Sequence, residues 1–216
     1  MAEDRSTVVG AVYRLLRYVL YHLVIVPAAW LLTVVAMRTR IRRRLRVTGP
    51  AVLVCNHVHP FDNLAVVRAA WPRMVRFNSQ PSNFHIPVAG WILRFFGTLE
   101  IGSGRTGRDR FLADNAEILG RGGLVGVFPE GKLVVNDPQL RRLLPGAFVL
   151  AEHVGVPVIP VVLRRSGSTV GWVWRRPQLD VVAGPSISGG TSRELRERAD
   201  AAMRELLARG IAAPPA

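Results

Sequence analysis

The chain has 216 residues, which is enough for one sizeable folded core with an additional N-terminal element. Its formal charge is +14, and a basic chain favours polyanionic partners such as nucleic acid, anionic lipid headgroups or phosphorylated small molecules. Cys55 is the only cysteine, which excludes an intramolecular disulfide, and no pair of cysteines suggests a zinc site.

The first predicted element is an apolar helix. Residues 19–37 carry no formal charge, and a membrane-spanning helix needs about 20 apolar residues. Pro27 lies near the middle and predicts a kink, while Tyr18, Tyr21 and Trp30 suit a membrane interface. A secretory signal peptide fits poorly because the run is long and leads into arginines. We expect a membrane helix, either spanning or re-entrant, with a buried helix of a soluble protein as the alternative.

A run of arginines follows this helix, with six in residues 38–46. Such a basic collar beside an apolar segment indicates contact with anionic lipid headgroups. It also predicts that the domain that follows lies on the cytoplasmic face of the inner (plasma) membrane. We therefore divide the chain into a membrane-associated helix with its collar, residues 1–46, and a folded domain, residues 47–216.

The remaining sequence alternates between strand and helix patterns. Strands are predicted at 51–55, 74–79, 98–102, 124–128, 156–163, 170–174 and 179–182, and helices at 62–71, 85–96, 108–119, 146–153 and 192–208. This alternation predicts a single α/β domain with a central mixed sheet flanked by helices. Two polar motifs, NHVHPFD and PEGK, directly follow apolar strands, which is where such sheets place their sites.

The first motif contains a candidate base. On an uninterrupted helix His57 and Asp62 would diverge by about 140°, but Pro60 disfavours a helical state before it. We therefore expect a turn that leads into a helix at Asp62 and brings carboxylate and imidazole together. A carboxylate on one ring nitrogen fixes the tautomer and leaves the other nitrogen as a general base. The alternative is that Asp62 only caps the helix.

The second motif places a carboxylate, Glu130, at a turn where Gly131 permits close backbone approach. Lys132 follows it, and Arg105 lies in a glycine-rich segment upstream. Either cation, with Arg108 or Arg110, can supply positive charge for a phosphate.

Together these motifs resemble the glycerolipid acyltransferases, the family of 1-acyl-glycerol-3-phosphate and related lysophospholipid acyltransferases. The resemblance rests on an NH-x4-D motif (Asn56, His57 and Asp62), on FPEG (residues 128–131) and on GVPVIPV (residues 155–161). The segment from Pro87 through Gly90 to Gly97 and the glycine-rich stretch through Arg108 are also similar, so the likeness covers about residues 47–163.

The resemblance implies that His57 deprotonates the acceptor hydroxyl while Asp62 orients and stabilises it. The hydroxyl then attacks acyl-CoA or acyl carrier protein directly, without an acyl-enzyme. It further implies that substrates are bound by residues of both motifs and by nearby cations: Asn56, Arg105, Phe128, Pro129, Glu130, Gly131 and Lys132. Membrane lipids and the acyl donor are the implied partners, and neither a metal, a bound cofactor nor nucleic acid is expected.

The sequence departs from the family pattern at its phosphate-binding positions. Ser103 stands where an arginine is usual, with Arg105 two residues on, and Lys132-Leu133 replaces a Thr-Arg pair. Asn63 replaces a proline or small apolar residue. An inactive lipid-binding member of the fold, or an acyltransferase for a non-phosphate glycolipid, is therefore an alternative.

Three other functions rest on single features. A metal-dependent hydrolase would use His59 and His85 together with His57 and Asp62. A thiol nucleophile would be Cys55, although a cysteine inside AVLVC suits a buried apolar position. Nucleic-acid binding would rest on charge alone, because no binding motif accompanies it.

Overall fold

The computed structural model describes residues 12–13, 15–36, 38–87, 89–95, 97–134, 139–166 and 178–208. Seven strands form one sheet in the order β1-β7-β6-β2-β5-β3-β4. The strands are β1 (Arg40–Arg43), β2 (Ala51–Cys55), β3 (Val75–Ser79), β4 (Leu99–Glu100), β5 (Leu124–Val127), β6 (Val158–Ser166) and β7 (Gln178–Ala183). Among the strand pairs of the described residues only β6–β7 is antiparallel, so the sheet is mixed, as the sequence predicted.

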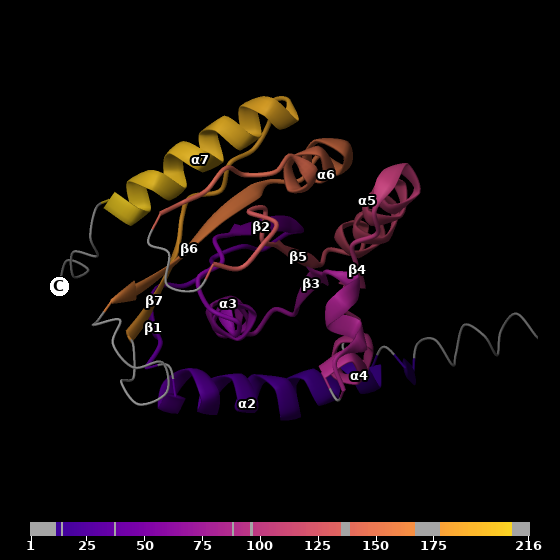
Figure 1. Cartoon of the computed structure of the whole chain (residues 1–216), viewed down its shortest axis with the longest axis vertical. Coiled ribbons are helices and arrows are strands. Elements are labelled where there is room, and N and C mark those ends of the chain that lie inside the picture. Colours follow the sequence, from indigo (N-terminus) through magenta and orange to yellow (C-terminus); the bar gives the residue numbers. More distant parts are fainter. Residues whose placement is uncertain are drawn as a thin grey trace, which may run out of the picture.

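Helices cover both faces of this sheet (Figure 1). They are α3 (Asp62–Ala70), the 3-10 helix η3 (Pro81–His85), α4 (Ala89–Phe95), α5 (Gly104–Gly120), α6 (Gly146–Val154) and α7 (Ser192–Ala208). Figure 1 shows α5, α6 and α7 on one side and α3 on the other. The predicted α/β domain is confirmed.

Strand β2 lies at the centre of the core, and all five of its residues are buried. Val52 and Val54 pack toward α5, α6 and α7, whereas Leu53 and Cys55 pack toward α3. A strand buried on both faces needs apolar residues at every position, which explains the uninterrupted AVLVC run.

The N-terminal helix, Leu15–Val35, is the outermost layer on the α3 side (Figure 1). It comprises two wide π-helical stretches, η1 (Tyr21–Ile25) and η2 (Leu32–Ala36), on either side of α2 (Val26–Leu31). Pro27 stands at the start of α2, directly after η1, so the wide turn accommodates the proline and the helix continues past it. Tyr21, Val26 and Ala29 are buried and pack with Val67 of α3.

The opposite side of the N-terminal helix is apolar and exposed. Leu15, Leu23 and Leu31 are each more than 60% exposed, and only 22% of the most apolar 18-residue window is buried. A core helix of a soluble protein would be mostly buried, whereas an exposed apolar face of this extent marks an interaction site or a membrane contact. By length and composition this helix is able to cross a membrane.

Several predicted boundaries differ from the observed ones. Strand β1 lies within the arginine collar, which the sequence analysis assigned to the N-terminal segment, and it pairs with β7 while Arg42 contacts Asp180. The division at residue 46 itself stays a prediction. Helix α5 begins at Gly104, four residues earlier than predicted, and η3 ends where a helix was expected to begin. The predicted strand 170–174, with Trp172 and Trp174, lies outside the described residues.

Candidate active site

The two motifs meet at one edge of the sheet. Strands β2 and β5 are parallel neighbours, with Val54 opposite Val127. The segment with His57 and the segment with Glu130 therefore leave the sheet side by side at the carboxyl ends of their strands. This is the edge at which α/β sheets bind their ligands.

The turn after β2 brings His57 and Asp62 into contact. Nδ1 of His57 lies 2.9 Å from Oδ2 of Asp62. The same oxygen accepts hydrogen bonds from the backbone N–H groups of Val58 and His59, over 2.6 and 2.8 Å. Asp62 is the first residue of α3, so its carboxylate also lies at the positive end of the helix dipole. Asp62 therefore does not cap its helix but organises the preceding loop.

Exposure differs sharply between the two side chains. The Asp62 side chain is fully buried, whereas the His57 side chain is 22% exposed. An ionised carboxylate on Nδ1 requires that nitrogen to carry a proton, which leaves Nε2 as the unprotonated, basic atom of the neutral ring. The pair thus has the geometry of an oriented general base.

Phe128 of the second motif supports the imidazole. Its ring stacks on His57 with centroids 4.4 Å apart and planes inclined by 25°. Phe77 of β3 stacks with Phe128 in turn, with centroids 5.9 Å apart. The imidazole is therefore held by a carboxylate at one nitrogen and by an aromatic ring on one face, which restricts its orientation.

Glu130 is paired with Arg141, a residue that no sequence motif marks as part of the site. Arg141 donates from Nε to Oε2 of Glu130 over 2.8 Å, and from Nη2 to the same oxygen and to the Lys132 carbonyl. The Glu130 side chain is only 3% exposed. Burial raises its pKa, while the hydrogen bond and charge of Arg141, followed by the backbone N–H and imidazole of His57, oppose the rise.

Gly131 and Asn56 have structural roles at the same edge. Gly131 has a φ of +73°, and a Cβ there would lie 2.8 Å from Cδ1 of Leu144, so only glycine fits without strain. The side-chain amide of Asn56 donates to the Leu163 carbonyl and accepts from the Leu163 N–H, which ties β2 to β6. Both the nitrogen and the oxygen of this amide thus already bond the backbone of Leu163. Substrate contact by Asn56 stays a prediction.

The predicted phosphate-binding cations both lie on the surface. Lys132 follows the FPEG turn, and Arg105 is in the first turn of α5. Neither side chain has a hydrogen bond or ion pair with another described residue. Pro129 contributes its carbonyl to Leu144 N–H, over 2.7 Å. The substrate contacts predicted for Lys132, Arg105, Pro129 and Phe128 stay predictions.

Comparison with known proteins agrees with these motifs. Residues 36–164, which include both, match the family described as Acyltransferase. The chain belongs to the acyltransferase family.

Members of this family named for lipid acylation are similar to the chain. A lysophospholipid acyltransferase of Homo sapiens is 30% identical over 154 residues, 68% of this chain and 28% of its own length. A chloroplastic 1-acyl-sn-glycerol-3-phosphate acyltransferase of Arabidopsis thaliana is 32% identical over 120 residues, 55% of this chain and 33% of its own length. The chain thus spans only about a third or less of these relatives.

A solved structure confirms the fold of this acyltransferase-family chain. The crystal structure of the 1-acyl-sn-glycerophosphate acyltransferase from Thermotoga maritima superposes with a TM-score of 0.60 and 18% identity. The match covers 81% of this chain and 72% of the other. At this identity the likeness speaks for the fold alone.

The competing site hypotheses find little support in this family member. Cys55 is fully buried, and burial followed by the charge of Asp62 raises the pKa of its thiol, which opposes the thiolate form. Nδ1 of His59 accepts the Phe61 N–H within its own turn. In the described part of the chain, no three histidine, cysteine or acidic side chains are grouped as metal ligands would be.

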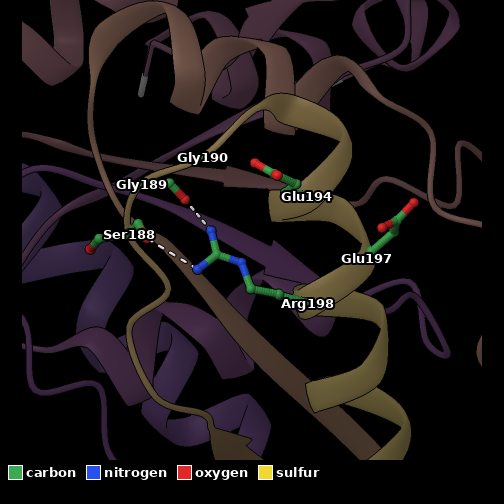
Figure 2. A pocket seen from close by; sticks show the side chains of 6 residues that line it. All are labelled: Ser188, Gly189, Gly190, Glu194, Glu197 and Arg198. Carbon is green, nitrogen blue, oxygen red and sulfur yellow. Dashed lines mark hydrogen bonds between the residues drawn. The ribbon is translucent and has the colours of Figure 1, made fainter.

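A hollow of about 440 Å³ lies elsewhere on the acyltransferase-family fold, between residues 188–190 and the start of α7 (Figure 2). Ile187, just before it, pairs with Val158, the first residue of β6. Because β6 runs parallel to β2, the hollow lies at the amino ends of these strands, whereas His57 follows the carboxyl end of β2. Arg198 inside it donates to the carbonyls of Ser188 and Gly189. These hydrogen bonds stabilise the loop that precedes α7, so we do not assign the active site to this hollow.

Proposed function

We propose that this protein transfers a fatty acyl group from acyl-CoA or acyl carrier protein to a hydroxyl of a lysophospholipid or related lipid acceptor. The observation that carries this proposal is the contact between His57 and buried Asp62 at the sheet edge, in a chain of the acyltransferase family. The names of the similar proteins support a lipid acceptor.

The reaction follows from the imidazole geometry. Nε2 of His57 removes the proton from the acceptor hydroxyl as its oxygen attacks the thioester carbonyl carbon. A C–O bond forms, the C–S bond breaks, and the imidazolium returns its proton to the departing thiolate. Asp62 stays ionised throughout and stabilises the transient imidazolium through Nδ1–H. A general base placed in this way contributes about 10²–10⁴ in rate.

Glu130, Gly131 and their neighbours are proposed to shape the acceptor site. The pair of Glu130 and Arg141 fixes the turn beside His57. Lys132 and Arg105 are the cations available for an acceptor phosphate, although lysine is a point charge and not a planar fork. No bound cofactor is needed, since the thioester supplies the activated acyl group.

The membrane brings the protein to its lipid acceptor. The exposed apolar side of the N-terminal helix contacts the bilayer, and the exposed collar arginines Arg40, Arg43, Arg44 and Arg46 contact anionic headgroups. The excess of arginine after the helix supports a catalytic domain on the cytoplasmic face of the inner membrane.

A second candidate function keeps the fold. The protein would then either bind lipid without catalysing transfer or acylate an acceptor that has no phosphate. Ser103 and Lys132-Leu133 stand where the family has arginine and Thr-Arg. These positions favour a glycolipid acceptor without phosphate, or an inactive lipid-binding member.

An acceptor panel tests these options. The purified full chain in detergent micelles is given labelled acyl-CoA or acyl carrier protein with lysophosphatidic acid, lysophosphatidylcholine or a monoacyl glycolipid, beside His57→Ala as background. We expect labelled diacyl product with a lysophospholipid. Lys132→Met and Arg105→Met should raise KM only for phosphate acceptors, whereas Arg121→Met, whose arginine pairs with Glu117 at the other end of α5, should not. Transfer to no acceptor would refute the proposed activity.

A further inference from the structure

An arginine lies on the side of the N-terminal helix that packs against the domain. Arg17 precedes Tyr21 by four residues, and the buried residues Ala29 and Thr33 continue the same spacing. Residues four apart share one side of a helix. Arg17 therefore extends the buried row that contacts α3 and β3 and not the exposed apolar side that contains Leu23 and Leu31.

Arg17 meets a second arginine there. A Cβ on Gly97 would lie 2.6 Å from Nη1 of Arg17 and 2.6 Å from Nη1 of Arg76 in β3. The two guanidinium groups therefore converge over one glycine, separated by no more than twice that distance. Gly97 has a φ of +68°, and a side chain at this position would fill the space into which both groups point.

Two like charges at this separation repel each other, most strongly where water is excluded. Both side chains are half-buried, and Nε of Arg17 is buried without a hydrogen-bond partner among the described residues. Burial, followed by the charge of Arg17, lowers the pKa of Arg76 to about 10. An anion between the two groups would replace this repulsion by attraction and would satisfy Nε of Arg17.

The arginine pair is remote from the catalytic residues along the sheet. Arg76 is opposite Val125, near the amino end of β5, whereas the catalytic motifs follow the carboxyl ends of β2 and β5. The pair therefore lies before the catalytic turns along the strand direction. At the same end of the N-terminal helix, Leu15 and Leu16 are exposed, as is Trp91 of α4, and exposed apolar side chains of this kind suit contact with a bilayer.

We propose that Arg17 and Arg76 bind the phosphate group of a membrane lipid at a site separate from the catalytic one. Guanidinium groups are suited to phosphate because their planar forks form paired, charge-assisted hydrogen bonds. A terminal phosphate monoester offers three oxygens and a larger charge than a diester, so it is the preferred headgroup. The bound lipid fastens the N-terminal helix to β3.

Vesicle binding of the full chain tests the site. Two sets of phosphatidylcholine vesicles contain either phosphatidic acid or phosphatidylglycerol, adjusted to equal surface charge. We expect the wild-type protein to prefer phosphatidic acid, and we expect Arg17→Gln and Arg76→Gln each to reduce binding to it roughly fivefold, since one arginine contributes about 1 kcal/mol near an anionic surface. Arg43→Gln, which removes an exposed collar arginine, should weaken both vesicle types equally. If Arg17→Gln and Arg76→Gln instead weaken binding to the two vesicle types equally, the proposed phosphate site is wrong.

Thermal unfolding in neutral detergent supplies the second readout. Without lipid, Arg17→Gln removes the repulsion from Arg76 together with a cation–π contact to the Tyr13 ring, so its Tm should stay near that of the wild type, whereas a Tm lowered as much as by Ala29→Gln would contradict the proposal. Added phosphatidic acid should raise the Tm of the wild-type protein and not that of the variant. Inorganic phosphate that raises Tm as much as the lipid would overturn the lipid as the source while retaining a phosphate ligand.

Discussion

Arg141 holds Glu130 through two of its nitrogens, and the same guanidinium reaches the Lys132 carbonyl. This contact joins the turn after β5 to the segment that leads into α6. The glutamate of the FPEG motif is thus a buried, paired carboxylate beside the catalytic turn, and its position depends on a residue eleven positions away in the chain.

Arg141→Met should lower the free energy of unfolding by about 1.5–3 kcal/mol, the range for hydrogen bonds to charged groups. Its guanidinium opposes the burial that raises the pKa of Glu130, so its loss raises that pKa further. A carboxyl group with a raised folded-state pKa destabilises the fold as pH rises through that pKa. The loss of unfolding free energy in Arg141→Met, relative to the wild type, should therefore be largest at neutral pH and become smaller toward acidic pH.

Measurements of the free energy of unfolding in detergent, from neutral to acidic pH, test this prediction. Arg142→Met, which removes the exposed neighbouring arginine, is the matched control and should change little at any pH. A deficit for Arg141→Met that grows on acidification would contradict the role assigned to the pair.

Phe128→Leu should lower kcat by roughly threefold to tenfold and leave KM for the acyl donor nearly unchanged. The stacked ring orients the imidazole, and such aromatic contacts contribute about 0.5–1.5 kcal/mol. Steady-state kinetics check this result. Phe77→Leu, which removes a ring that touches Phe128 and not His57, should have a smaller effect. An equal loss in both variants would argue for general packing and against orientation of His57.

Cys55→Ala should retain most of the activity, because the thiol is fully buried and its thiolate is disfavoured. Iodoacetamide should label the native protein only after unfolding, as judged by mass spectrometry. Rapid labelling that also abolishes transfer would revive the thiol nucleophile.

The two sides of the N-terminal helix should respond differently to substitution. Leu23→Gln and Leu31→Gln, on the exposed side, should weaken vesicle binding by roughly tenfold to a hundredfold each, since burying a leucine contributes about 1.5–3 kcal/mol. Their Tm in detergent should stay near that of the wild type. Ala29→Gln, at a fully buried position, should lower Tm instead. Similar Tm losses on both sides would show a core helix and not a membrane contact.

The sequence predicted what local chemistry determines. The apolar run at β2, the turn imposed by Pro60 and the helix at Asp62 made the contact between His57 and Asp62 one of two expected outcomes, beside a simple helix cap, and the structure shows the contact. Helix α7 has its predicted bounds. Strand β1 escaped prediction because RIRR reads as a solvated collar, and only pairing with β7 reveals it. Gly102 and Gly107 approach so closely that a Cβ on Gly107 would clash, so the glycine-rich stretch enters α5 instead of preceding it.

Long-range contacts account for the rest of the site. Arg141 has no local pattern that marks it as the partner of Glu130, because the two residues are eleven positions apart and belong to no common predicted element. The reciprocal bonding of Asn56 with Leu163 likewise depends on the neighbouring strand β6. The convergence of Arg17 and Arg76 follows only from how the N-terminal helix packs on β3.

The most direct test of the catalytic proposal is the kcat of His57→Gln for transfer from labelled acyl-CoA to a lysophospholipid, with Tm measured beside it. The substitution keeps a polar side chain at a position that is 22% exposed, so the fold should persist. With His57 as the base, we expect a fall in kcat of about 10²–10⁴ with little change in donor KM. A kcat within about tenfold of the wild type would contradict His57 as the base.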